Sequence, residues 1–377
     1  MKRIWKQIIC SFFILFTILF SGCNQRKHDT SPEYNAETDY PMAYGESGSS
    51  THFVETEKGY YYTTSDGFLY FVDKSTMQAI AVCNRPQCVH SIEKFEECGA
   101  FLGLYAPDEI YYNNGKLYGF KHNQEYGVIG FEDVYFCEMA EDGTVTKKLW
   151  ELQWEGGLPG DYQYGVFHRG VLYFYTTSPN SDFSIHAYDV ESKKSKCIYM
   201  NEGGSGTHLK AVGNYLYWWM PKNDDILFSP PMRYEISTGK IDTIENIQKC
   251  FAGGDRVYFQ GWDEEKQCAL LSYSDRDGSG FTKTDIFLKA RLHADDTHIY
   301  GCERETGTIY VYDIATMEEI ATLDFSELYA QYKTDVLLPG YGDKIFLMDD
   351  QRYNIFYAYK STIGTDEFQW YQVEKVN

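Results

Sequence analysis

One pattern recurs seven times along the chain: a turn residue, a short gap, a residue pair ending in an aromatic, and a later aromatic–acidic pair leading into another turn. The pairs end at seven positions: Tyr62, Tyr118, Tyr173, Tyr217, Tyr258, Tyr300 and Phe346. By subtraction, these positions lie 56, 55, 44, 41, 42 and 46 residues apart. A strand-rich repeat of about forty residues is typical of a β-propeller blade. We therefore expect an all-β fold, a β-propeller with seven four-stranded blades, with six or eight blades as alternatives.

The individual repeats read as antiparallel strands joined by tight turns. In the third repeat, residues 164–167 lead into the turn His168-Arg169-Gly170, and an alternating strand follows from Val171 to Thr176. Period-two runs bounded by Gly, Asp and Asn indicate such a meander. The 34 tyrosines and 24 phenylalanines suit half-buried strands. No stretch of a dozen residues shows helical periodicity with caps, so the pattern favours strands throughout.

The first 22 residues have the character of a bacterial export signal. Lys2, Arg3 and Lys6 precede an apolar run from Ile8 to Phe20. This run is short for a membrane span. It ends in Leu-Phe-Ser-Gly-Cys at residues 19–23, which resembles the lipobox that precedes a diacylated cysteine, with Phe20 where Leu is usual. We predict a lipoprotein signal peptide over residues 1–22 and lipidation of Cys23; a cleaved secretory peptide or a membrane anchor are the alternatives.

A polar segment separates the signal from the repeats. Residues 24–50 include Ser31-Pro32 and a Gly/Ser-rich tract at 45–50. So few apolar residues predict a lipidated, flexible tether over 23–50, followed by the propeller over 51–377. Without Lys2, Arg3 and Lys6, the formal charge falls from −21 to −24. Such a negative body disfavours nucleic acid as a partner, and the charge is expected to serve solubility.

The repeats also resemble those of a known group of proteins. The motifs are Leu216-Tyr217-Trp218, Tyr188-Asp189-Val190 and Asp277-Gly278-Ser279-Gly280. They resemble the β-propeller lipoproteins of Firmicute-type bacteria whose repeats carry a domain-of-unknown-function label and, more loosely, YWTD and TolB-like propellers. The resemblance covers residues 51–375. It implies a propeller exported and anchored by lipid, although YWTD propellers have six blades where seven repeats are counted here.

One local cluster of residues carries recognisable chemistry. Cys83, Cys88 and His90 are followed by Cys98, within the connection that lengthens the first repeat spacing. A similar Cys-x4-Cys-x-His…Cys insert is associated with the same lipoprotein group. Three thiolates and one imidazole can complete a tetrahedral structural zinc site and order a long loop. The insert at 83–98 also suits a disulfide (Cys88–Cys98 or Cys83–Cys98) with one spare thiol, or three unpaired thiols.

Candidate ligand-binding residues lie in loops between the second and third strands of two repeats. They are two tryptophans beside carboxylates: Trp219, Asp224, Asp225, Trp262 and Asp263. Aromatic rings stack on sugar C–H faces and carboxylates accept hydroxyl protons, so this combination suits carbohydrate. The alternative is that Trp218 and Trp219 straddle a strand and pack between blades. The carboxylates can also suit a glycosidase, but sequence spacing does not set their separation.

These features predict a function for the whole chain. We expect a lipid-anchored, monomeric propeller on the outer face of the bacterial cytoplasmic membrane, touching the membrane through its lipid only. It would act as a non-catalytic binding or scaffold protein for a glycan, a peptide or an envelope protein, and no catalytic residue is assigned. A propeller-type polysaccharide lyase or glycoside hydrolase is the alternative, since propellers carry unrelated functions.

Overall fold

The computed structural model describes most of the repeat region and part of the segment before it. The described residues are 28–33, 35, 39, 52–91, 94, 98–103, 109–122, 134–151, 164–177, 182–202, 207–219, 231–244, 249–263, 265–288 and 290–376. The chain divides into two compact units, residues 1–30 and residues 31–377, and the fold described below is that of the second unit. Within the described ranges, no helix combines the length and apolar character needed to cross a membrane.

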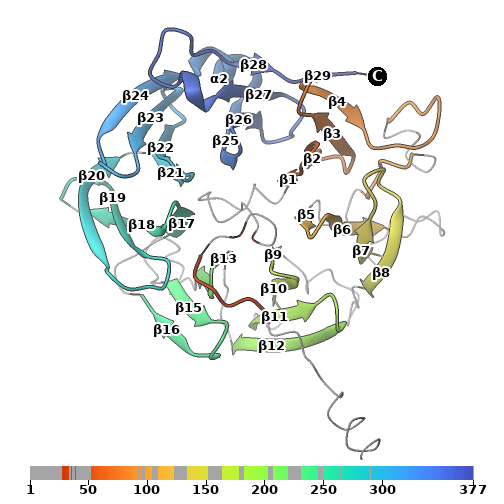
Figure 1. The fold of residues 1–377 in the computed structure, drawn as a ribbon, viewed down its shortest axis with the longest axis horizontal. Helices are drawn as coiled ribbons and strands as arrows, with labels where there is room; N and C mark the ends of the chain where they lie inside the picture. The colour runs from red at the N-terminus through yellow and green to blue at the C-terminus, as the bar shows by residue number, and fades with distance from the viewer. Residues whose placement is uncertain are drawn as a thin grey trace, which may run out of the picture. The chain divides into compact units, whose positions relative to one another are not determined.

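Seven sheets of four antiparallel strands form a ring around a centre, as Figure 1 shows. The first three sheets are β1–β4 (Phe53–Glu55, Gly59–Thr63, Leu69–Asp73, Gln78–Ala81), β5–β8 (Ile110–Asn113, Lys116–His122, Val134–Met139, Val145–Glu151) and β9–β12 (Tyr164–His168, Val171–Thr177, Phe183–Asp189, Lys194–Asn201). The next two are β13–β16 (Thr207–Val212, Tyr215–Trp219, Pro231–Glu235, Ile241–Thr243) and β17–β20 (Lys249–Gly253, Arg256–Asp263, Cys268–Asp275, Thr282–Leu288). The last two are β21–β24 (Arg291–Ala294, His298–Glu303, Thr308–Asp313, Glu319–Asp324) and β25–β28 (Thr334–Tyr341, Lys344–Asp349, Ile355–Tyr359, Tyr371–Gln372). The prediction of a seven-bladed propeller is confirmed.

The recurring aromatic occupies the second strand of every blade, where burial is greatest. All five residues of β2 and all six of β26 are buried, whereas the outermost strand β24 is largely exposed. Aromatic rings of this strand pack between neighbouring blades. Phe346 of blade 7 lies 4.8 Å from Tyr60 of blade 1, and Tyr118 of blade 2 lies 4.9 Å from Phe167 of blade 3, between ring centroids. The repeat period thus reflects an aromatic side chain that packs between adjacent sheets in each blade.

The C-terminus closes the ring by adding a fifth strand to the first blade. Strand β29 (Glu374–Lys375) pairs in parallel with β4, with Glu374 opposite Gln78. The amide of Val376 donates to the Ala79 carbonyl at 2.9 Å. The Lys375 ammonium lies 4.7 Å from the centre of the Tyr70 ring, a cation–π contact with the first blade. The last residues of the chain therefore join blade 7 to blade 1.

One short helix lies where the sequence indicated strands throughout. Helix α2 (Ser326–Tyr332) connects blades 6 and 7, and a 3₁₀ turn, η6 (Lys360–Thr362), follows β27. Seven residues span about two turns, too few for helical periodicity to stand out in a sequence. The helix also has no side-chain cap at Phe325, so neither usual signal was present.

The strand order gives the ring two different faces. The "hairpin face" carries the turns joining first to second and third to fourth strands, such as Asn114-Gly115 and Arg169-Gly170. The "long-loop face" carries the connections from second to third strands and from one blade to the next. The longest of these span residues 82–109, 123–133, 152–163 and 220–230. The strand bounds therefore put the longest sequence separations between consecutive strands on the long-loop face.

Candidate metal centre

The Cys/His insert begins at the end of β4 and returns along β3. The Val82 amide donates to the Leu69 carbonyl at 2.9 Å, which extends the β3–β4 pairing. After the insert, the Leu69 amide donates to the Ala100 carbonyl at 2.8 Å, and Phe101 forms an isolated bridge with Phe68. Both ends of the insert are thus held against the first blade by backbone hydrogen bonds.

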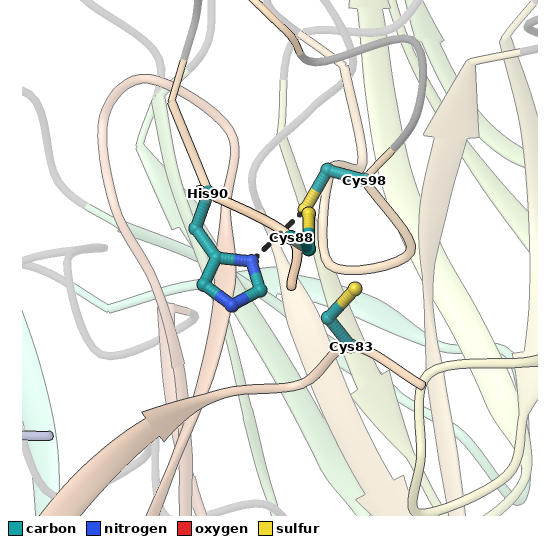
Figure 2. Close-up of side chains that lie close together, drawn as sticks. All are labelled: Cys83, Cys88, His90 and Cys98. Carbon is teal, nitrogen blue, oxygen red and sulfur yellow. Dashed lines mark hydrogen bonds between the residues drawn. The ribbon is translucent and has the colours of Figure 1, made fainter. Parts of the chain in front are cut away.

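The four candidate ligands converge on one point, although the insert carries no strand of its own among the described residues. One donor atom from each of Cys83, Cys88, His90 and Cys98 lies within 4.8 Å of the other three. Figure 2 shows the side chains close together, with the His90 Nδ1 3.4 Å from the Cys98 Sγ. Zn–S bonds of about 2.3 Å and Zn–N bonds of about 2.0 Å at tetrahedral angles place N and S about 3.5 Å apart. The separation of 3.4 Å between the two atoms suits a shared metal ion.

No disulfide joins the three sulfurs of the insert. All of them are free thiols, and Cys98 is buried while Cys83 and Cys88 are half-buried. The Cys98 side chain packs in a small apolar cluster with Phe68, Ala100 and Phe101. Such a wall excludes water from one side of the site.

Backbone geometry sets the directions of the ligands. His90 has a φ of +49°, a conformation that costs energy for a residue with a side chain and that accompanies the turn of its ring toward the thiols. The Gly99 amide donates to the Cys83 Sγ at 3.3 Å. A Cβ at Gly99 would be in ordinary contact with that sulfur at 3.5 Å and in tight contact with Asn84 Oδ1 at 3.3 Å, so this glycine packs closely against the ligand loop. Residues between the ligands therefore support the arrangement.

The surroundings shift the pKa values of Cys83 and Cys98 in opposite directions. Burial acts to raise the pKa of Cys83, but hydrogen bonds from the backbone amides of Arg85, Gly99 and Ala100 and from the Cys88 side chain together outweigh it, and the pKa is lowered. Burial raises the pKa of Cys98 to about 12, and a hydrogen bond with Cys88 adds to this effect. A divalent cation would supply the positive charge that three thiolates at such close range require.

Lys121 is a neighbour of this site that the ligand spacing did not indicate. It comes from β6 of blade 2, and its Nζ lies 3.4 Å from the Gly99 carbonyl oxygen. Burial lowers the pKa of Lys121, while the nearby thiols of Cys137, Cys98 and Cys83 act to raise it. The cluster thus contacts both blade 1 and blade 2. Only the tertiary fold brings Lys121 to it, because no ligand-type spacing in the sequence links the two segments.

The other sequence-predicted site residues do not gather in the described part of the chain. Trp219, at the end of β14, is 5% exposed and packs in an apolar cluster with Tyr217 and Phe259. The Asp263 carboxylate accepts a hydrogen bond from the Lys266 amide at 2.8 Å within its own turn. Cys23, Asp224, Asp225 and the side chain of Trp262 lie outside the described residues. The prediction of a ligand site at these positions stays untested.

The fold has counterparts among solved structures, whereas the sequence has none among known families. No family model and no curated protein matches the chain. The propeller domain of the Trilobed protease from Pyrococcus furiosus is 12% identical, with a TM-score of 0.47, over 86% of this chain and 94% of that chain. A puromycin-hydrolyzing peptidase from Mycobacterium tuberculosis is 10% identical (TM-score 0.45, over 81% and 49%), and a prolyl endopeptidase structure is 10% identical (TM-score 0.49, over 80% and 45%).

The seven sheets define this protein as a seven-bladed β-propeller. The chain spans about half the length of the last two peptidases. At such low identity the likeness concerns the fold alone, and the blade count rests on the seven sheets.

Proposed function

We propose that this protein is a lipid-anchored propeller of the bacterial cell surface that acts as a non-catalytic binding or scaffold protein. The observation that supports this proposal is the difference between the two faces of the ring. Turns of two to six residues join the hairpins of six blades, whereas on the opposite face 28 residues separate β4 from β5, and 11 residues separate β6 from β7 and β14 from β15. Long loops held by a rigid scaffold are where proteins usually place binding residues. The long-loop face is thus the proposed binding surface for a glycan, a peptide or an envelope protein.

The proposal includes a structural Zn²⁺ held by Cys83, Cys88, His90 and Cys98. A Cys₃His set fills all four positions of a tetrahedral zinc ion and leaves none for substrate, which is the pattern of a structural site. Metal binding would stabilise an insert whose described residues form no strand and only a small apolar cluster. The role of the ion would be to fix the connection between blades 1 and 2.

Metal analysis of the purified, reduced protein tests this part. We expect one equivalent of zinc, and Co²⁺ substitution should give thiolate-to-metal charge-transfer absorption. Cys88→Ser should lose the metal, whereas Cys268→Ser is the matched control, because Cys268 lies on β19 of blade 5. Chelation should lower the melting temperature of the wild type but not that of Cys88→Ser. Reduced protein that takes up no stoichiometric zinc or cobalt would end the zinc assignment.

The binding role and the anchor need separate measurements. Mass spectrometry of the N-terminal peptide should find a diacylglyceryl group on Cys23 that Cys23→Ala abolishes; an unmodified cysteine contradicts the anchor. At least one member of a panel of bacterial and host glycans, envelope peptides and purified envelope proteins should bind the protein saturably. Substitutions in the loops of the long-loop face should weaken binding of that ligand. Turnover of a polysaccharide by the purified protein would instead support the lyase or hydrolase alternative.

A further inference from the structure

A short part of the segment before the first blade is bound to the hairpin face. The Arg169 guanidinium, in the first turn of blade 3, forms a two-pronged ion pair with the Asp39 carboxylate. Its Nε lies 2.6 Å from Oδ1 and its Nη2 lies 2.8 Å from Oδ2. The side chains of Arg169 and Asp39 are only 3% and 5% exposed. A bidentate pair sequestered in this way is specific in direction and in partner.

The same guanidinium also binds the backbone of the segment. Nη1 donates to the Ser31 carbonyl and Nη2 to the Glu33 carbonyl, each at 2.7 Å. The Asp39 amide donates to the Asn35 carbonyl at 2.7 Å, and the Asn35 amide donates to Asp39 Oδ2 at 3.1 Å. The segment therefore folds around Arg169. A buried ion pair is stable only when further hydrogen bonds compensate both charges, and here they do.

The blade surface is shaped to accept the segment. Arg169 has a φ of +51°, close to the +50° of Asn114 and the +52° of Gly254 in the equivalent turns, so the hairpin sets this conformation and places the side chain on the face of the ring. In the neighbouring turn, Gly213 has a φ of +55°, and a Cβ there would lie 2.5 Å from the Pro32 carbonyl oxygen. His168 Nε2 lies 2.7 Å from the Gly213 carbonyl oxygen and links the two turns. The contact thus uses a platform shared by blades 3 and 4.

The turn of blade 3 also differs in sequence from the equivalent turns of other blades. The equivalent two-residue turns of other blades are Asn114-Gly115, Gly213-Asn214, Gly254-Asp255 and Gly342-Asp343. All of these contain residues that suit tight hairpins, and none carries a basic side chain. An arginine in the corresponding turn of blade 3 is not required by the hairpin. Its contacts with Ser31, Glu33 and Asp39 account for its presence.

We propose that Arg169 is the centre of an intramolecular latch that orients the protein on the membrane. Ser31, Glu33 and Asp39 are held on the hairpin face, and Cys23 precedes Ser31 by eight residues, a reach of at most about 28 Å. A lipid on Cys23 would then keep the hairpin face toward the bilayer and the long-loop face outward. The latch itself stands on the contacts above, whereas the orientation rests on the proposed lipid anchor.

Hydrogen exchange of the full-length protein tests the latch without reference to the membrane. The amides of Asn35 and Asp39 should exchange at least about tenfold more slowly in the wild type than in Arg169→Gln. Arg169→Lys should restore little of this protection from exchange, because an ammonium group cannot form the bidentate hydrogen bonds of a planar guanidinium. Arg276→Gln is the matched control: Arg276 lies in a turn of the same face and donates to the Gly254 carbonyl at 2.7 Å, so the segment should stay protected. Equal exchange in wild type and Arg169→Gln would refute the latch.

Energy transfer to acceptor lipids in liposomes tests the orientation. A fluorescent amino acid is placed at Lys193, in a turn of the hairpin face, or at Lys266, in a connection of the long-loop face; both positions are exposed. Transfer should be stronger from position 193, and Arg169→Gln should remove the difference while Arg276→Gln keeps it. Equal transfer from both positions in the wild type would overturn the orientation.

A second arm separates this proposal from the lipid anchor. The same fluorescent proteins are coupled enzymatically at residue 23 to a synthetic lipid, so that anchoring no longer depends on cellular lipidation. If the natural protein does not bind liposomes but the coupled protein shows the expected difference, the anchor fails and the latch survives. If both bind and neither shows a difference, the latch does not orient the propeller.

Discussion

The tyrosines of the repeat allow one chemical change to be tested in two environments. Tyr62 on β2 of blade 1 and Tyr300 on β22 of blade 6 each lie on the second strand of a blade, and both are fully buried. The Tyr300 hydroxyl donates to Asp295 Oδ2 at 2.7 Å. The Tyr62 hydroxyl has no hydrogen-bond partner among the described residues. Burial raises the pKa of Tyr62 and that of Tyr300 well above the usual tyrosine range, so both stay protonated. Tyrosine to phenylalanine should therefore have opposite effects on stability.

The magnitudes follow from the hydroxyl's partners. A hydrogen bond to a charged group contributes about 1.5–3 kcal/mol, and Tyr300→Phe should cost about 2 kcal/mol, since the Asp295 carboxylate keeps the Lys360 ammonium at 2.8 Å. An unpaired buried hydroxyl costs about 1–3 kcal/mol, so Tyr62→Phe should be neutral or stabilise by up to about 1 kcal/mol. At about 2.1 cal/mol/K per residue, a propeller of about 325 residues shifts its melting temperature by about 1.5 °C per kcal/mol.

Calorimetry or circular dichroism on purified protein measures the difference. Tyr300→Phe should melt about 3 °C below the wild type and Tyr62→Phe at the wild-type temperature or up to about 1.5 °C above it. Urea midpoints should rank the three proteins in the same order. A loss for Tyr62→Phe equal to that for Tyr300→Phe would refute the reasoning, because it would show that the Tyr62 hydroxyl has a partner.

Three further predictions concern other contacts in the ring. Burial acts to raise the pKa of Asp295, but the Lys360 charge and several hydrogen bonds lower it, so its ionised form stabilises the fold above about pH 4. Lys360→Met should destabilise the protein at pH 7, and the gap in urea midpoint should narrow as the pH falls below about 4; a constant gap would contradict this. Ending the chain at Gln372 removes β29 and should lower the melting temperature and speed amide exchange in β4, whereas unchanged exchange there would rule out a closing role. Gly307 has a φ of +69°, and a Cβ would lie 2.4 Å from the Ser326 Cα, so Gly307→Ala should cost about 2 kcal/mol in chemical denaturation, and a neutral result would count against the close contact.

The sequence was informative where a pattern repeats locally. Blade number followed from the spacing of seven aromatics, because the second strand of every blade carries an aromatic that packs against a neighbouring sheet. In blade 1 the register makes Tyr61, one residue before Tyr62, the structural equivalent of Tyr118. The Cys/His insert was also visible, since its four ligands lie within sixteen residues. Helix α2 was not, because seven residues leave no periodic trace. The metal ligands could be named from the sequence, but their separation could not, since a loop without strands gives no register.

Contacts between distant segments were beyond the reach of any local pattern. Arg169 and Asp39 lie 130 residues apart, and nothing in either neighbourhood identifies the other. The same holds for Lys121 beside the insert and for β29 on β4. In this protein the spacing of aromatics along the chain specifies the propeller, because burial and strand pairing act locally within each repeat. Closing the ring, holding the N-terminal segment and gathering the ligands depend on which surfaces meet once all seven blades have formed, and only the tertiary structure decides that.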